Sequence, residues 1–159
     1  MVDVDALAVD SKGGVTMSEY ININEQTVEA GQNVLLNDSI PCNKGYVIHR
    51  NGTGILTLRG IVNSPCAKFA RYLVTFGANI AIPTGGTVDP ISIALALDGE
   101  PIRSSLAIST PAAVEEYNNV SFSAYVTVPS GCCFTIAVEN TSGDAILVQN
   151  ANLTISRTA

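Results

Sequence analysis

The chain has 159 residues and a mass of 16.6 kDa, which suits one domain with a single hydrophobic core. Charged residues make up 14% of the sequence, against about 25% in average soluble domains, so the polar surface must consist mainly of Ser, Thr, Asn and Gly. The net charge of -6, with only 8 Lys and Arg, gives no electrostatic footprint for a nucleic acid or an anionic membrane, and we exclude both as partners.

The first 20 residues are acidic and show no sustained hydrophobic period. They form either a disordered leader or an arm that becomes ordered only on a partner, and the sequence leaves both interpretations open. In the second interpretation four apolar side chains would dock on the partner: Val2, Val4, Leu7 and Val9. Acidic residues stand where a signal peptide needs a basic and an apolar region, so no export signal is expected. We therefore divide the chain into an arm, 1–20, and a domain, 21–159.

Strand-like patterns begin after the arm. Short apolar runs at 26–30, 34–36, 46–50 and 55–59 are separated by turn residues. Asn51 and Gly52 lie between the last two runs, and this dipeptide predicts a hairpin with a type I′ turn because both residues tolerate a positive φ.

The middle of the chain contains the longest alternating run. Apolar residues occupy every second position from Tyr72 to Ile82, which predicts a central strand. A second run at 91–97 ends at Asp98 and Gly99, a pair that predicts a hairpin to a return strand over 102–108. The one fragment compatible with a helix, 112–117, is too short to be stable alone.

Three further runs fill the last third of the chain. Residues 120–128 alternate, a corner follows at 129–131, and runs at 132–138 and 145–155 complete the pattern. In the last run Ile146, Leu147 and Val148 place apolar side chains on both faces of the strand. A strand with one face in solvent is apolar on only one face. The second face of this strand therefore needs cover, and another copy of the chain is the predicted source.

The runs add up to eight to ten short strands, with turns at the spacing of a β-sandwich or jelly roll. No membrane span is predicted, because the longest uncharged stretch, 117–138, is interrupted by Asn, Ser, Pro and Gly.

Catalytic signatures are poorly represented. His49 is the only histidine and lies beside a predicted turn. No nucleophile motif accompanies it, so we do not expect the protein to be an enzyme. The four cysteines, Cys42, Cys66, Cys132 and Cys133, lack the paired spacing of a zinc site. We expect reduced core or interface residues, with Cys132 and Cys133 on opposite faces of a strand; a bridge between Cys42 and Cys66 is the alternative.

Four segments between Tyr72 and Ile155 resemble the globular heads of the tumour-necrosis-factor (TNF) and complement C1q superfamily, in its bacterial and phage branch. They are the strand YLVTFGANI, the segment SIALALDGEPI, the strand-corner-strand SFSAYVTVPSGCCFTIAVEN and the ending ANLTISR. This branch includes the C-terminal domains of collagen-like spore-surface glycoproteins.

The resemblance implies an all-β, ten-stranded jelly roll that associates as a homotrimer about a threefold axis. The sheet facing that axis would use the parity opposite to the core. This nominates six interface residues: Leu73, Thr75, Tyr125, Thr127, Ile146 and Val148. Some superfamily members bind calcium near the top of the trimer, and Asp89, Asp98 and Asp144 lie in predicted loops. No spaced acidic motif supports such a site, so no metal and no cofactor are expected.

A compact trimeric knob with a short arm, without a Gly-X-Y stalk or an export signal, is similar to a phage capsid decoration or head-fibre protein. On this hypothesis the arm binds the major capsid protein, the knob lies on the capsid exterior of the virion, and a host-surface glycan is a further candidate ligand. The alternative is a trimeric adhesin of a bacterial cell or spore surface. A lectin-like domain is a third hypothesis, with few aromatic platforms to support it.

Overall fold

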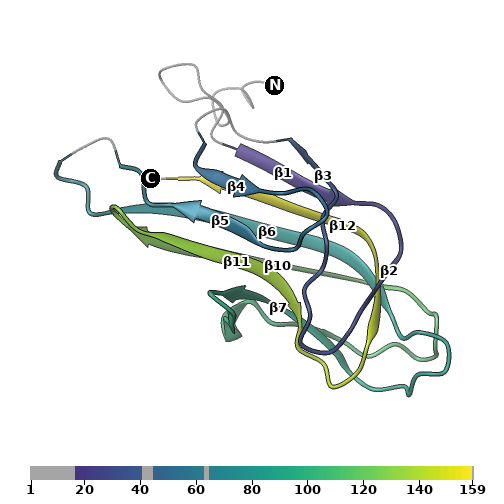
Figure 1. Ribbon diagram of the computed structural model, residues 1–159. Coiled ribbons are helices and arrows are strands. Elements are labelled where there is room, and N and C mark those ends of the chain that lie inside the picture. The colour runs from purple at the N-terminus through teal and green to yellow at the C-terminus, as the bar shows by residue number, and fades with distance from the viewer. Residues whose placement is uncertain (1–16, 41–44, 63–64, 159) are drawn as a thin grey trace, which may run out of the picture.

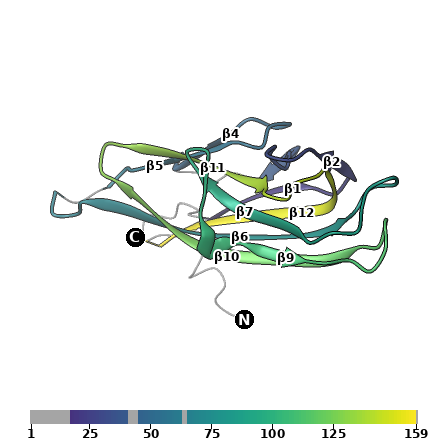
Figure 2. The same cartoon turned by 90° about the horizontal axis from the view of Figure 1, so that it is seen from below.

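Two antiparallel β-sheets pack face to face in the computed structural model, which describes residues 17–40, 45–62 and 65–158 (Figures 1 and 2). The first sheet has the strand order β10 (Asn118–Pro129), β6 (Phe69–Ala81), β12 (Ile146–Arg157), β1 (Met17–Asn22) and β3 (Asp38–Ile40), with β2 (Gln26–Val28) also paired to β12. The second has the order β4 (Val47–His49), β5 (Leu56–Arg59), β11 (Cys133–Asn140), β7 (Ile91–Leu97) and β8 (Glu100–Pro101), with β9 (Ala107–Ser109) also paired to β7. The predicted all-β sandwich of about ten strands is confirmed.

The core lies between the two sheets and consists of the inward-facing side chains of each strand. Phe76 on β6 and Phe122 on β10 stack with ring centroids 5.5 Å apart. Tyr72 reaches across the core from β6, and its hydroxyl donates a hydrogen bond to the main-chain carbonyl of Arg59 in the second sheet. The two layers are therefore joined by a polar contact as well as by apolar packing.

Strand β6 is central, as its alternating run predicts. It pairs with β10 on one side, from Phe69 opposite Pro129 to Ile80 opposite Asn118, and with β12 on the other. Every second residue of β6, including Tyr72, is buried in the core.

A β-bulge interrupts β12 and changes which of its residues face the core. Gln149 lies opposite Asn79, but Asn152 lies opposite Gly77, so β12 has one more residue than β6 here. Asn150 has a positive φ of 57°. Because side chains alternate along a strand, one extra residue moves the buried parity from the even to the odd positions.

The bulge corrects the prediction that β12 has two apolar faces in need of cover. Ile146 and Val148 are 1% and 0% exposed and belong to the core before the bulge. Ala151, Leu153 and Ile155 belong to the same core after it. The strand changes parity, so Ile146 and Val148 need no second copy to bury them. Leu147 lies on the opposite parity before the bulge and is only 8% exposed within the single chain.

The two predicted hairpin turns have different outcomes. Asp98 and Gly99 both have positive φ, 49° and 88°, and join β7 to β8 as a type I′ turn, as predicted. At the other turn only Gly52 has a positive φ, and the Thr53 amide bonds the Arg50 carbonyl at 3.1 Å. That turn has type II form, so the type I′ prediction is wrong there.

The predicted return strand over 102–108 is broken. A single turn of 3₁₀ helix, Arg103–Ser105, separates β8 from β9. The hydroxyl of Ser105 accepts a hydrogen bond from the Leu95 amide at 2.8 Å, so a side chain replaces a main-chain partner of β7. No helix in the described residues is long and apolar enough to cross a membrane.

Strand β1 begins inside the predicted arm. Residues 17–20 pair with β12, and Tyr20 is 1% exposed in the core. The last four residues assigned to the arm, 17–20, therefore belong to the sheet. The four apolar residues expected to dock on a partner, Val2, Val4, Leu7 and Val9, lie outside the described residues.

The corner between β10 and β11 is fixed to the end of β5 by Gly60. The Gly60 amide bonds the Cys132 carbonyl at 2.9 Å, and the Gly131 amide bonds the Gly60 carbonyl at 3.1 Å. A Cβ atom at Gly60 would lie 2.0 Å from the carbonyl oxygen of Pro129. The close approach therefore requires glycine at this position.

We predict that Asn150→Val lowers the free energy of unfolding by about 1–2 kcal/mol, because a β-branched residue is strained at positive φ. Asn150→Gly should stay within about 1 kcal/mol of the wild type, since glycine adopts this conformation freely. Urea denaturation of both variants measures the difference. Equal losses in the two variants would contradict the assigned backbone conformation.

We predict that Gly60→Val costs about 3 kcal/mol or more of unfolding free energy, because its side chain would collide with main-chain atoms of the corner. The matched control is Gly143→Ala, where a Cβ atom meets no heavy atom within 4 Å. Chemical denaturation of the control should give a change of about 0.5 kcal/mol or less. A Gly60→Val protein as stable as the control would show that the corner does not need this contact.

Candidate functional site

The candidate site is the outer face, which we define as the side of the first sheet turned away from the core. Pairing registers align its side chains in rows across the sheet. One row contains Tyr125, Leu73, Ser156 and Met17, and the next contains Ser123, Thr75, Thr154, Glu19 and Ile40. The sandwich thus presents a broad surface built by strands that are far apart in the chain.

The outer face is short of charge and carries exposed apolar side chains. Tyr125 is 58% exposed, and Phe69, Met17 and Ile40 are also exposed. Many of the remaining side chains are hydroxyls: Thr75, Ser121, Ser123, Thr127, Thr154 and Ser156. The exposed aromatic and Met side chains and the scarcity of charge are features that this face shares with protein interfaces.

Charged groups on the outer face are largely engaged within it. The guanidinium of Arg71 lies 4.9 Å from the centroid of the Tyr125 ring. The carboxylate of Glu19 accepts a hydrogen bond from the side-chain amide of Asn152. These two contacts reduce the cost of covering Arg71 and Glu19, whereas Asp38 on β3 is an exposed carboxylate at the border of the face.

Four of the six residues nominated for a trimer interface lie together on this face. Tyr125 is directly opposite Leu73, and Thr127 is two residues further along β10. The hydroxyl of Thr75 lies 3.4 Å from that of Ser123. The other two nominated residues, Ile146 and Val148, lie in the core, because the bulge puts their parity on the inner side.

Sequence reasoning missed the contribution of β1 and β3 to the outer face. Met17, Glu19 and Ile21 alternate with the buried Ser18 and Tyr20, which is a usable strand signal. The assignment of 17–20 to the arm concealed it. Ile40 on β3 could not be placed, since a three-residue strand carries no periodicity.

Strand β10 forms one border of the outer face and is an unusual edge strand. It spans 12 residues, contains no charged side chain and pairs with β6 without a register shift. The other edge strands, β3, β4, β8 and β9, span three residues or fewer. Proteins protect exposed edges by shortness, charge, proline, bulges or a covering element. This long edge has only Pro129 at its end and β9 beside its start, where Asn118 donates a hydrogen bond to Ser109.

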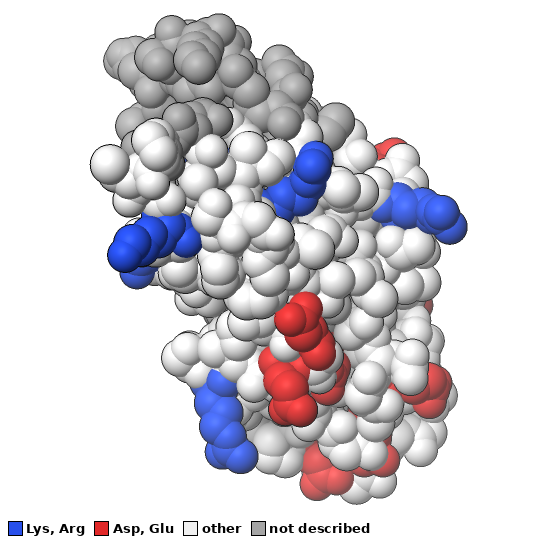
Figure 3. Space-filling view, turned by 60° about the vertical axis from the view of Figure 1, so that its left-hand side comes forward, with Lys and Arg blue, Asp and Glu red and all other residues white. Residues whose placement is uncertain are grey.

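The end of the sandwich opposite Met17 is acidic. Its loops contain no Lys or Arg and carry six exposed carboxylates: Glu25, Glu29, Asp89, Glu115, Glu116 and Asp144. In Figure 3 most acidic side chains lie in the lower half of the molecule and most basic ones in the upper half. Tyr117 accordingly donates a hydrogen bond to Glu25, and burial, this bond and nearby negative charge raise the pKa of Tyr117 to about 12.

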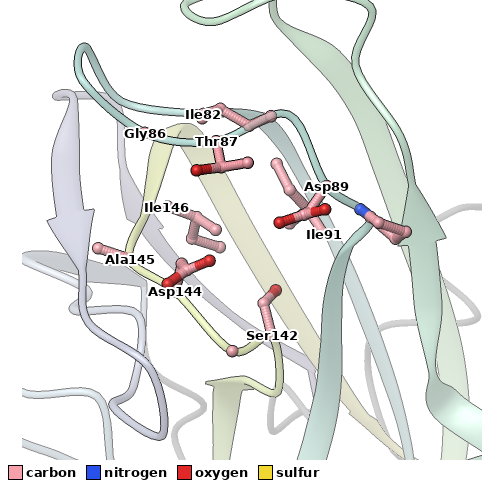
Figure 4. Close-up of a pocket in the computed structure, with 11 residues that line it drawn as sticks. Ile82, Gly86, Thr87, Asp89, Ile91, Ser142, Asp144, Ala145 and Ile146 are labelled. Carbon is pink, nitrogen blue, oxygen red and sulfur yellow. The ribbon is translucent and has the colours of Figure 1, made fainter.

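The three aspartates considered for calcium are not brought together. Asp89 and Asp144 line one cavity of about 240 Å³, shared with Thr87 and Ser142 (Figure 4). Asp98 instead accepts hydrogen bonds from the amide and hydroxyl of Thr135, at 2.8 and 3.0 Å. Within the described ranges, no group of three or more His, Cys, Asp or Glu residues could hold a metal ion.

His49 has a structural environment. Its Nε2 lies 2.9 Å from the carbonyl oxygen of Thr53, and its ring meets that of Tyr20 edge-on at 4.9 Å. The ring therefore closes the hairpin after β4 and packs on the core.

Comparison with solved structures identifies the fold, whereas comparisons of the sequence give no match. No family model matches the sequence. A search of curated proteins also gives no match. Among solved structures, the globular domain of zebrafish complement 1qA protein matches with a TM-score of 0.60 and 16% identity, over 88% of this chain and 94% of that chain. Murine APRIL matches with a TM-score of 0.62 and 11% identity, over 89% and 98%.

A third similar structure is the Eiger TNF from S. frugiperda, with a TM-score of 0.60 and 14% identity over 89% of this chain and 92% of that chain. At these identities the likeness concerns the fold, and it extends over nearly the whole of each compared domain. The chain therefore has the jelly-roll fold shared by TNF and C1q domains.

Proposed function

We propose that the protein is a homotrimeric structural protein of a phage particle, a capsid decoration or head-fibre knob that stabilises the shell or presents a host-facing surface. The outer face forms the trimer interface, and residues 1–16 bind the major capsid protein. The observation that carries the proposal is the exposed, charge-poor outer face, with Tyr125 and Leu73 near its border with β10. The resemblance to TNF and C1q heads implies the same oligomer.

A closed ring of three subunits needs two different surfaces that fit each other. The outer face is one such surface. The edge of β10 is the second, since it borders the outer face and most of its length is uncovered. Packing the edge of one subunit on the outer face of the next would bury both in every subunit.

A place on the outside of a particle is supported by composition and geometry. With 14% charged residues, the surface is mostly uncharged polar groups, which suits a tightly assembled shell component. Met17 lies opposite Ser156, so the segment before β1 joins the fold at one end, and the acidic loops lie at the other. Three attachment segments per trimer would bind multivalently, which raises avidity without a strong individual contact.

We predict that the wild-type protein has a mass in solution near three times 16.6 kDa and that Tyr125→Asp is a monomer. Burying a carboxylate in an interface costs several kcal/mol of desolvation, which an ion pair with the neighbouring Arg71 offsets only in part. Light scattering after size exclusion measures both masses. The matched control is Ile48→Asp on β4, where an apolar residue of similar exposure, 54%, lies on the second sheet.

The control variant should remain trimeric. A monomeric wild type would exclude the trimer, and loss of the trimer in both variants would show that the outer face is not the specific interface.

We predict that a protein lacking residues 1–16 remains a folded trimer but no longer associates with phage particles, since the truncation leaves β1 and Tyr20 intact. Co-sedimentation with capsids stripped of the protein measures the association. Capsid binding that survives the truncation would exclude residues 1–16 as the anchor. A trimer with no affinity for any capsid would favour the bacterial surface adhesin.

A further inference from the structure

The corner between β10 and β11 exposes two adjacent thiols. Cys132 and Cys133 are both exposed, so of the predicted core or interface positions on opposite faces of a strand, the core position is wrong. Cys132 belongs to the turn, where the alternation of a strand has not yet begun. Both residues line one cavity of about 280 Å³, together with Arg59, Gly60, Ile61 and Gly131.

A guanidinium forms part of the wall of the same cavity. Arg59 lies directly opposite Cys133 in the β5–β11 pairing, so their side chains are neighbours on one face of the second sheet. Nη1 of Arg59 donates a hydrogen bond to the carbonyl of Gly45 at 3.2 Å, which orients the side chain and leaves its other N–H groups for a ligand. The two main-chain bonds of Gly60 hold the corner in place.

The two thiols are poorly placed to form a disulfide with each other. Adjacent Cα atoms across a trans peptide are about 3.8 Å apart, whereas disulfides join Cα atoms about 4.4–6.8 Å apart. No cis peptide is present in the described chain. A mixed disulfide formed at one thiol would therefore not be expelled readily by the other.

We propose that Cys133 is a modification site for small anionic disulfides of the glutathione type, with Arg59 binding a carboxylate of the reagent. Carboxylates are the groups that a guanidinium recognises best, through paired N–H donors. A cavity of this size accommodates part of such a molecule beside the thiol. The site lies on the second sheet, on the side of the sandwich turned away from the outer face.

The reaction is a thiol–disulfide exchange. The thiolate of Cys133 attacks one sulfur of the reagent, a new S–S bond forms, and the original S–S bond breaks. The leaving thiolate takes up the proton that Cys133 gave up. The protein sulfur is oxidised, one reagent sulfur is reduced to a thiol, and no other oxidant is consumed.

The test compares oxidised glutathione, which is anionic, with cystamine, a cationic disulfide. The full-length protein is treated with each, and peptide mass spectrometry measures the rate of adduct formation at Cys133. We expect a stable mixed disulfide that Cys133→Ser abolishes and Cys132→Ser retains. Absence of the adduct, its location on Cys132, or loss of two hydrogens without an adduct would overturn the proposal.

The role of Arg59 is tested by the ratio of the two rates. In Arg59→Gln the preference for oxidised glutathione over cystamine should fall about fivefold, as expected for one contact between unit charges at a water-exposed surface. Arg59→Lys should retain most of the preference. The control is Arg103→Gln, which removes an exposed guanidinium in the 3₁₀ turn between β8 and β9. An equal effect of the control, or no effect of Arg59→Gln, would exclude the assigned role.

Discussion

The sandwich depends on β12, which keeps apolar side chains in the core along its whole length. These side chains occupy even positions in the first half of the strand and odd positions in the second half. Asn150 makes this possible by adopting a positive φ and adding one residue to the strand. Strands β1, β2 and β6 all pair with β12, so their registers follow from this one adjustment. Without it, either Ile146 and Val148 or Leu153 and Ile155 would face outward.

Most of the fold could be predicted because long strands with one buried face have a clear period. Strands β6 and β10 follow that period without interruption, and Asp98 with Gly99 determines the turn that joins β7 to β8. The parity change in β12 could not be predicted, since an apolar run on both parities fits a bulge as well as a doubly covered strand. Short strands such as β3 lacked enough residues for any pattern.

The candidate site was predictable to the extent that it lies on those long strands. Leu73 and Tyr125 follow from parity once the inner face of β6 and β10 is known. Met17 and Ile40 depend on which strands are neighbours, which pairing over long sequence separation decides and local sequence does not. The exposure of Cys133 likewise depends on the corner that Gly60 holds against β5.

The opposition of Met17 and Ser156 has a practical consequence for engineering. Both ends of the described fold leave from one side, and the loop containing Gly143 lies on the other, where an added Cβ atom meets nothing. A guest peptide inserted at Gly143 would therefore point away from any fusion partner or solid support attached through the ends. The fold is suited to serve as a display scaffold in which attachment and presentation are spatially separated.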